Sequence, residues 1–195
     1  MNLWENLKFE VTTCNLCKLS HTRKNIVLGE GDINSPIMFI GEAPNDVDEK
    51  MELPFCDESG KLFTKILNSV KIDRNNVYLT NIVKCKTPSG RNPEEDEIIA
   101  CSRYLETQIA LINPKIIVAV GAVAANFFLK EHMKNGIKGV RGVFYKWYGD
   151  IKVIAIFDPN FLLRNSSTKE GSPKQETWKD IQNIRKEYDK YLEKE

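Results

Sequence analysis

The 195-residue sequence has no long hydrophobic run. Its longest apolar stretches, residues 36–40 and 115–120, have the length of strands, whereas a membrane-spanning helix needs roughly 18 apolar residues. Residues 1–10 contain acids and no apolar segment, so they lack the pattern of a secretory signal. We therefore expect a cytoplasmic protein whose cysteines stay reduced and, where they are grouped, bind metal.

Internal repeats, low-complexity linkers and the heptad pattern of a coiled coil are absent too. The length is typical of one domain, and a composition of 42% hydrophobic and 28% charged residues is ordinary for a globular protein. We therefore expect a single domain over residues 1–195 that acts as a monomer.

The sequence has almost no excess of charge of one sign, since its formal net charge is +1. The distribution of the charges is more informative. Residues 42–58 contain seven acids and one lysine, whereas residues 134–152 contain five basic residues, one acid and several aromatic residues. The second stretch has the character of a surface that follows a phosphate backbone and stacks on bases. A basic β-hairpin that packs its aromatic side chains inward is an equally good interpretation.

Short apolar runs alternate with amphipathic segments along the chain. The pattern predicts strands at 36–41, 77–81, 115–120, 143–148 and 152–157, helices at 61–70, 93–112, 122–129 and 174–192, and polar loops at 42–59 and 165–173. Such an alternation indicates a three-layer α/β/α fold with a central, mostly parallel sheet. Ligands bind these sheets at the carboxyl ends of the strands, which here are Gly41, Asn81, Gly121 and Asp158.

Four of the five cysteines have the spacing of a metal site. Cys14 and Cys17 form a C-x2-C pair, and Cys85 and Cys101 follow after a long gap. Four thiolates bind a zinc ion or a 4Fe-4S cluster equally well, and the spacing favours the cluster only slightly. Buried cysteines without a metal are a third interpretation. The fifth cysteine, Cys56, has no paired partner and is interpreted as a packed residue.

Several short motifs follow one another in a specific order, although each is weak alone. They are Cys14-x2-Cys17, Gly41-Glu-Ala-Pro44, Leu53-Pro-Phe55, Ser59-Gly60, Thr80-Asn-Ile-Val-Lys-Cys85, Arg91-x-Pro93, Asp158-Pro-x-Phe-Leu-Leu-Arg164 and Trp178-Lys-Asp. In these motifs the sequence resembles the family-4 uracil-DNA glycosylases, the thermostable iron–sulfur branch of that superfamily, over nearly the whole chain. The resemblance implies a uracil-DNA glycosylase-like fold, excision of uracil from single- or double-stranded DNA, and a 4Fe-4S cluster on the four cysteines.

The resemblance also implies roles that agree with the chemistry of the side chains. Asn81 offers an amide donor and an acceptor, which match O4 and N3–H of uracil and mismatch cytosine. Phe55 is suited to stack on a base flipped out of the duplex, and the backbone of Gly41 and Ala43 to contact the base or sugar. Glu42 is the carboxylate expected to position water or to stabilise a cationic sugar.

The run Leu162, Leu163 and Arg164 is expected to offer an apolar wedge and a phosphate contact to DNA. Each of these site residues also has an ordinary structural interpretation, such as core packing for the two leucines or turn capping for Asn81. The ordered motifs favour the functional interpretation for Asn81, Phe55 and Glu42, and leave the wedge open.

Asp158 is the main departure from the family pattern, which usually has histidine there, donating to uracil O2. An ionised aspartate only accepts hydrogen bonds and repels a base that leaves as an anion, so as a catalytic residue it requires a raised pKa. Asn45, residues 56–58 and the loop 88–91 also depart from the pattern. The alternative function is therefore a glycosylase-fold iron–sulfur protein with altered base specificity, or with weak or no uracil excision, that binds nucleic acid.

Overall fold

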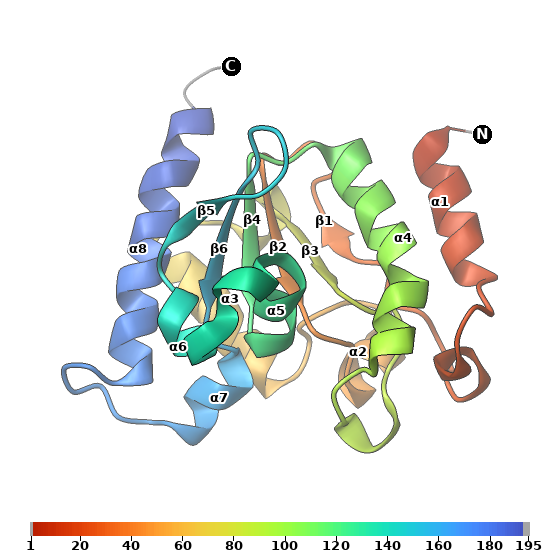
Figure 1. The fold of residues 1–195 in the computed structure, drawn as a ribbon, viewed down its shortest axis with the longest axis horizontal. Coiled ribbons are helices and arrows are strands. Elements are labelled where there is room, and N and C mark those ends of the chain that lie inside the picture. Colours follow the sequence, from red (N-terminus) through yellow and green to blue (C-terminus); the bar gives the residue numbers. More distant parts are fainter. Residues whose placement is uncertain (1, 193–195) are drawn as a thin grey trace.

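The computed structural model describes residues 2–192, and these residues contain one six-stranded sheet. Its strand order is β1 (Glu30–Gly31), β3 (Tyr78–Asn81), β2 (Ile37–Gly41), β4 (Ile116–Val120), β6 (Lys152–Ile156) and β5 (Phe144–Lys146). The four central strands are parallel, and the two edge strands run antiparallel to their neighbours. The predicted mostly parallel sheet is confirmed, and the carboxyl ends of its central strands lie at the lower edge in Figure 1.

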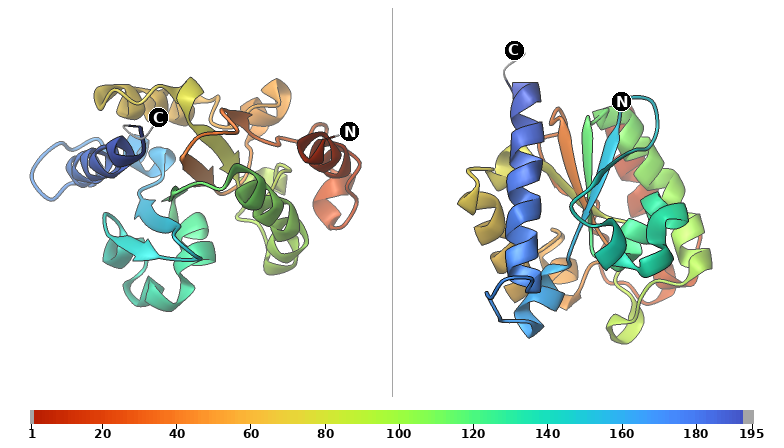
Figure 2. Two further views of the ribbon diagram at one scale, coloured as in Figure 1. Left: turned by 90° about the horizontal axis from the view of Figure 1, so that it is seen from above. Right: turned by 60° about the vertical axis from the view of Figure 1, so that its left-hand side comes forward.

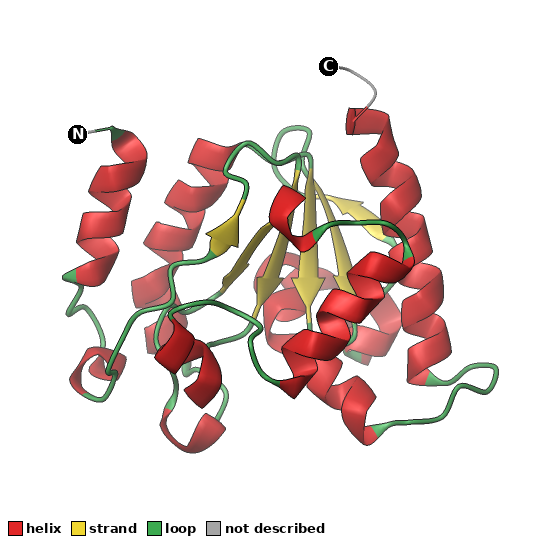
Figure 3. Ribbon diagram, turned by 180° about the vertical axis from the view of Figure 1, so that it is seen from behind, coloured by secondary structure: helices red, strands yellow, loops and turns green. Residues whose placement is uncertain are grey.

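Helices cover both faces of the sheet (Figures 2 and 3). One face packs against α1 (Leu3–Thr12), α4 (Glu95–Ile112), α5 (Ala122–Leu129) and α6 (Ile137–Val140), the other against α3 (Glu58–Ser69) and α8 (Pro173–Leu192). In β2, Met38 and Ile40 join the first of these hydrophobic clusters, and Ile37 and Phe39 join the second. Because the side chains of a strand alternate between its faces, an entirely apolar strand needs cover on both.

The segment 42–59, predicted as a loop, instead contains helix α2 (Asp46–Met51) and the start of α3. Asn45 begins α2 with a capping box, in which its side chain accepts from the Asp48 N–H and the Asp48 carboxylate accepts from the Asn45 N–H. This helix was missed because only two of its six residues are apolar, so the segment has no hydrophobic periodicity.

Other elements were also missed or misplaced. Helices α1 and α7 (Pro159–Arg164) were not predicted, nor were the 3-10 turns η1 (Lys18–His21), η2 (Arg74–Asn76), η3 (Pro88–Gly90) and η4 (Lys130–Asn135). Pro93, expected in the first turn of α4, precedes the capping residue Glu94 and lies outside the helix. Most of the predicted helices and strands begin and end within about two residues of the observed bounds, which is the usual scatter of such boundaries.

The basic and aromatic stretch 134–152 begins near the cleft end of the sheet, where Lys138 lies, and continues through β5 to the opposite end. Strand β5 pairs with β6 from Phe144↔Ile154 to Lys146↔Lys152, so the turn that follows lies at the end opposite the carboxyl ends of the central strands. Trp147 contacts Phe128 edge-on, with ring centroids 5.2 Å apart, but it is still 37% exposed and Tyr148 is 76% exposed, so the aromatic side chains of this hairpin do not all pack inward. No helix within residues 2–192 is long and apolar enough to cross a membrane.

Candidate functional site

A cleft of about 580 Å³ opens at the carboxyl ends of strands β2, β3 and β6. Its walls come from the loop after β2, from helices α5, α6 and α7, and from the segment around η3. Predicted site residues that line it are Glu42, Ala43, Phe55, Asn81, Asp158 and Arg164. Residues distant in the sequence thus meet at the edge of the sheet where the alternating fold predicts a ligand site.

Asn81 ends strand β3 beside Gly41, the last residue of β2. Its side chain is buried, and its Nδ2 donor has no hydrogen-bond partner among the described residues. Leaving a buried donor unsatisfied costs roughly 1–3 kcal/mol, so this amide gains from a ligand that accepts its hydrogen bond. Glycine is needed next to it, because a Cβ at position 41 would lie 2.5 Å from Asn81 Oδ1 and 2.7 Å from Phe55 Cζ.

Phe55 is held in an unusual conformation beside this amide. Its φ of 55° lies in the left-handed region, which costs a non-glycine residue about 1 kcal/mol or more. Its ring stacks on Phe63 with centroids 5.0 Å apart. The Phe55 carbonyl accepts a hydrogen bond from Arg74 Nη1 at 2.9 Å, and Arg74 also bonds the Pro54 carbonyl and pairs with Glu30. These contacts fix the aromatic ring at the wall of the cleft.

Glu42 and Asp158 bring two carboxylates into the cleft. Burial, and then the negative charge of Asp158, raise the pKa of Glu42 from 4.5 to about 7. Burial also raises the pKa of Asp158, against main-chain hydrogen bonds from the first turn of α7 and the positive charge of Arg164. Because each negative charge disfavours the other, the two carboxylates bind a proton more readily than isolated ones do.

The rim of the cleft carries basic side chains. Arg91, Lys138 and Arg164 all line it, and Arg91 is already engaged with the buried Glu97 through two hydrogen bonds of 2.8 and 2.6 Å. Lys138 and Arg164 form no salt bridge with another described residue, so their charge is available to phosphates.

The structure places the two leucines of the predicted wedge in different environments. Leu162 is 1% exposed and packs inside, so the expectation that it inserts into DNA is incompatible with its burial. Leu163 is 44% exposed, and Arg164 lines the cleft. Both leucines lie in helix α7, where neighbouring positions point in different directions, and this helix was not part of the sequence prediction.

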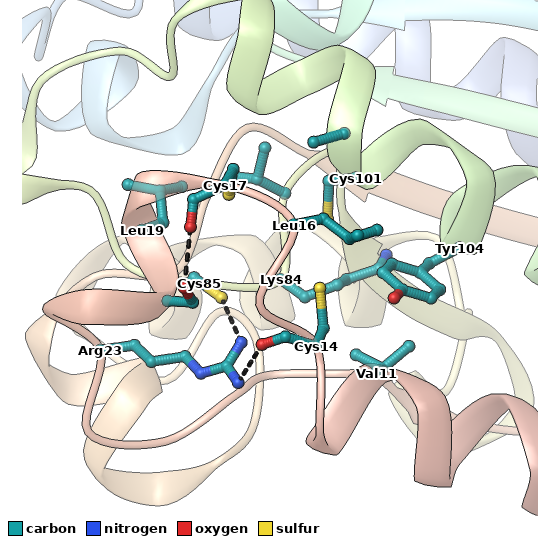
Figure 4. A pocket seen from close by; sticks show the side chains of 13 residues that line it. Val11, Cys14, Leu16, Cys17, Leu19, Arg23, Lys84, Cys85, Cys101 and Tyr104 are labelled. Atoms are coloured by element: carbon teal, nitrogen blue, oxygen red, sulfur yellow. Dashed lines mark hydrogen bonds between the residues drawn. The ribbon is translucent and has the colours of Figure 1, made fainter.

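The predicted ligands Cys14, Cys17, Cys85 and Cys101 line one small cavity, and all are free thiols (Figure 4). They come from the segment after α1, the segment after β3 and helix α4. The remaining walls are mostly apolar and include Val11, Leu16, Leu19, Val83 and Tyr104. The fold thus brings together cysteines that are separated by up to 87 positions in the sequence.

Four thiolates match the ligand sets of both predicted metals. Zinc binds thiolates at about 2.3 Å, so four of its sulfur ligands lie only about 3.8 Å apart. Within residues 2–192, no three His, Cys, Asp or Glu side chains are close enough together to hold one metal ion.

Two basic side chains accompany the cysteines. Arg23 donates from Nη1 to Cys85 Sγ at 3.3 Å and from Nη2 to the Cys14 carbonyl at 2.6 Å (Figure 4). Lys84 lines the same cavity and is 1% exposed. A set of four thiolates carries negative charge, and positive groups at this distance stabilise it.

A family model of the uracil DNA glycosylase superfamily matches residues 28–182. The chain belongs to the uracil-DNA glycosylase superfamily. The type-4 uracil-DNA glycosylase of Thermotoga maritima is 41% identical to it over 167 residues, which cover 86% of each chain. The type-4 enzyme of Saccharolobus solfataricus is 45% identical over 80% of this chain and 75% of its own length. The type-4 enzyme of Archaeoglobus fulgidus is 35% identical over 87% of this chain and 88% of its own length. These relatives confirm the predicted resemblance to family 4.

Three residues of this sequence that depart from the family-4 pattern serve as N-caps of helices around the cleft. Asn45 caps α2, and the Asp57 carboxylate caps α3 by accepting from the Gly60 N–H at 3.0 Å. Asp158 caps α7 by accepting from the Asn160 N–H at 2.7 Å. Asn and Asp are among the preferred N-cap residues. Asp158 therefore orients α7 in addition to facing Glu42.

Sequence reasoning overlooked two residues that support the site in this superfamily member. Arg74 lies in a short 3-10 turn, and a lone arginine there carries no motif. Lys84 stands within the motif Thr80–Cys85 and was passed over because lysines are usually exposed. The sequence does contain a signal for Lys84, because it lies between the site residue Asn81 and the predicted ligand Cys85 in a motif that supplied both of those residues.

Proposed function

We propose that this protein hydrolyses the N-glycosidic bond of deoxyuridine in DNA and releases uracil. The observation that carries the proposal is the buried, unpartnered amide of Asn81, which lines the cleft together with Phe55. An amide donor and acceptor match O4 and N3–H of uracil, whereas cytosine presents the reverse pattern. The superfamily membership, and the uracil-DNA glycosylase activity for which the type-4 relatives are named, support the same substrate.

Each residue of the cleft has a role in this reaction. The flipped base stacks on Phe55 and bonds to Asn81, and the side-chain-free backbone at Gly41 permits the close approach of both groups. Glu42, with a pKa of about 7, is partly ionised at neutral pH and orients the attacking water or stabilises the sugar cation. Asp158 caps α7 and raises the proton affinity of Glu42.

DNA is held by charge at the rim. Lys138 and Arg164 line the cleft and supply phosphate contacts, which position the strand without reading its sequence. Leu163 is the exposed apolar side chain next to Arg164 and takes the place of the flipped base in the stack.

The four cysteines are proposed to hold a 4Fe-4S cluster. When bound, the cluster cross-links the segment after α1, the segment after β3 and helix α4. Arg23 donates to the sulfur of one proposed ligand, Cys85, and to the carbonyl of another, Cys14, and thereby fixes the loop that carries the C-x2-C pair.

The test is an excision assay on an oligonucleotide with a single uracil, single-stranded or paired, followed by alkali to cut abasic sites. The wild-type protein is expected to cut, and Asn81→Ala to lose about a hundredfold or more in rate, because the site's specific hydrogen bonds are lost. Asn183→Ala, on the exposed side of α8, is the matched control with unchanged rate. Binding without cleavage by the wild type, combined with cleavage by Asp158→His, would replace the proposal with the altered-specificity alternative.

A further inference from the structure

Lys84 lies between the cysteine cavity and the base-recognition residue Asn81. Its side chain is 1% exposed, and its Nζ donates to Thr80 Oγ1 and to the Asn81 carbonyl, both at 2.7 Å. The same side chain lines the cavity of the four cysteines (Figure 4). One ammonium group therefore touches the end of strand β3 and borders the proposed metal site.

The charge of Lys84 has no carboxylate counterpart in the described part of the chain. Cys85, its neighbour in the chain, and Cys101 line the same cavity as its side chain. Burying an ammonium is costly unless an opposite charge lies near it, and two neutral oxygens do not provide that charge. The counter-charge is supplied when the cysteines are thiolates, which is their form as metal ligands.

The hydrogen bonds of Lys84 continue into the structure that holds Asn81. Thr80 Oγ1 accepts from Lys84 and donates to the Leu28 carbonyl at 2.8 Å, which ties β3 to the segment preceding β1. The Asn81 carbonyl belongs to the residue whose amide faces the cleft. A shift of the ammonium would therefore move the backbone from which the Asn81 side chain projects.

We propose that Lys84 is a positioning residue that couples the filled cysteine site to base recognition by Asn81. With the site filled, the thiolates hold the ammonium in place, and the ammonium holds the end of β3. Without that negative charge, the buried cation is unfavourable and the strand end loosens. This inference rests on the proposed function, since it assigns uracil as the base that Asn81 selects.

The test measures base selectivity rather than turnover. The probes are two single-stranded oligonucleotides, one with 2′-fluoro-deoxyuridine, whose fluorine resists glycosidic cleavage, and one with 2′-fluoro-deoxycytidine at the same place, because cytosine presents the reverse pattern of donor and acceptor to Asn81. The ratio of their dissociation constants is determined for wild type, Lys84→Met, Asn81→Ala and the double variant. We expect Lys84→Met to lower the uracil preference about tenfold, as expected for losing hydrogen bonds from a charged donor. The double variant is expected to lose no more uracil preference than Asn81→Ala alone, because the effects of two coupled residues are not additive.

Metal retention gives the second readout. Iron release into a chelator is expected to be faster in Lys84→Met than in wild type. It is expected to be unchanged in Asn81→Ala, because the Asn81 side chain lines the cleft and not the cysteine cavity. Thr80→Val removes one acceptor of Lys84, together with the hydrogen bond from Thr80 to the Leu28 carbonyl, and leaves the residues that line the cavity unchanged. It is used in case Lys84→Met does not fold, with Thr80→Ser as its hydroxyl-retaining control. Thr80→Val is expected to lower selectivity, and Thr80→Ser to leave it unchanged.

The possible failures are distinct. Equal selectivity in wild type, Lys84→Met and Thr80→Val, or losses that multiply in the double variant, would overturn the coupling and leave the proposed function intact. A wild type that does not prefer the uracil probe would overturn the proposed function, and the inference with it.

Discussion

Gly41 and Asn81 end neighbouring parallel strands side by side, and a Cβ at position 41 would lie 2.5 Å from Asn81 Oδ1. The absence of a side chain on one strand thus makes room for the recognition amide on the next. The same missing Cβ would stand 2.7 Å from Phe55 Cζ, so Gly41 sets the positions of both groups proposed to hold the base.

Gly41→Ala is expected to reduce uracil excision by about a hundredfold, because displacing a positioned group by about 1 Å has effects of this size. The free energy of unfolding should fall by about 1–3 kcal/mol, the usual cost of overpacking. The measurements are initial excision rates and urea unfolding. Gly139→Ala, where the nearest atom to the new Cβ is a side-chain carbon of Asn135 at 3.0 Å, is the control, and equal rates in both variants would contradict the steric argument.

Asp158→Asn is expected to move the acid limb of the excision profile to lower pH. Asp158 raises the pKa of Glu42, so removing its charge lowers that pKa, and Glu42 stays ionised in more acidic solution. Asparagine still caps α7, so the geometry of that helix is kept. The measurement is kcat/KM between pH 4.5 and 9, with Asp158→Ala as the variant that loses both charge and cap. An unshifted limb would show that Glu42 is not the group that titrates.

Glu42→Gln is expected to stabilise the fold at pH 8 and not at pH 4. A carboxyl whose pKa is raised on folding stabilises the native state below its unfolded pKa, and this contribution is lost as the pH rises through about 7. The gain at pH 8 should be about 1–2 kcal/mol after allowing for solvent screening. Thermal unfolding of both proteins at the two pH values checks this. A gain at pH 4 equal to that at pH 8 would assign the effect to packing.

The layers of the fold were predictable because each strand is a continuous apolar run. Residues 37–40 are all buried, and they divide between two hydrophobic clusters, which only a sheet covered on both faces explains. Helices α2 and α7 were not predictable in the same way. Both have six residues, and they are defined by the side chains that cap them, Asn45 and Asp158, rather than by periodicity.

The candidate site was predictable as far as the resemblance reached. Its motifs supplied Asn81, Phe55 and Glu42, which the structure brings into one cleft. The resemblance did not supply the contacts behind them, since Arg74 and Lys84 act through neighbours from other parts of the chain. Such partners depend on tertiary packing, which no local pattern encodes.

Arg74→Ala is expected to weaken uracil excision by loosening Phe55. The variant leaves the carbonyls of Pro54 and Phe55 without their donor and Glu30 without its partner, at a cost of about 2 kcal/mol in the free energy of unfolding. The left-handed backbone of Phe55 then relaxes, and kcat/KM should fall about tenfold. Arg74→Lys keeps the charge but not the planar fork, so an intermediate rate is expected. If Arg74→Ala is less stable but has wild-type kinetics, Arg74 contributes to the stability of the fold and not to the positioning of Phe55.

Cys101→Ser is expected to abolish iron binding, whereas Cys56→Ser leaves it intact. Cys101 lines the cavity with the other three predicted ligands, and Cys56 lies outside it on the Phe55 loop, so the pair separates a ligand from an ordinary thiol. The wild type and Cys56→Ser, purified without oxygen, should be brown and contain about four iron atoms per chain, and Cys101→Ser should be colourless. Because the proposed cluster ties three segments together, Cys101→Ser should also unfold at a lower temperature. Elemental analysis decides the metal, and a colourless wild type that contains zinc would exclude the cluster.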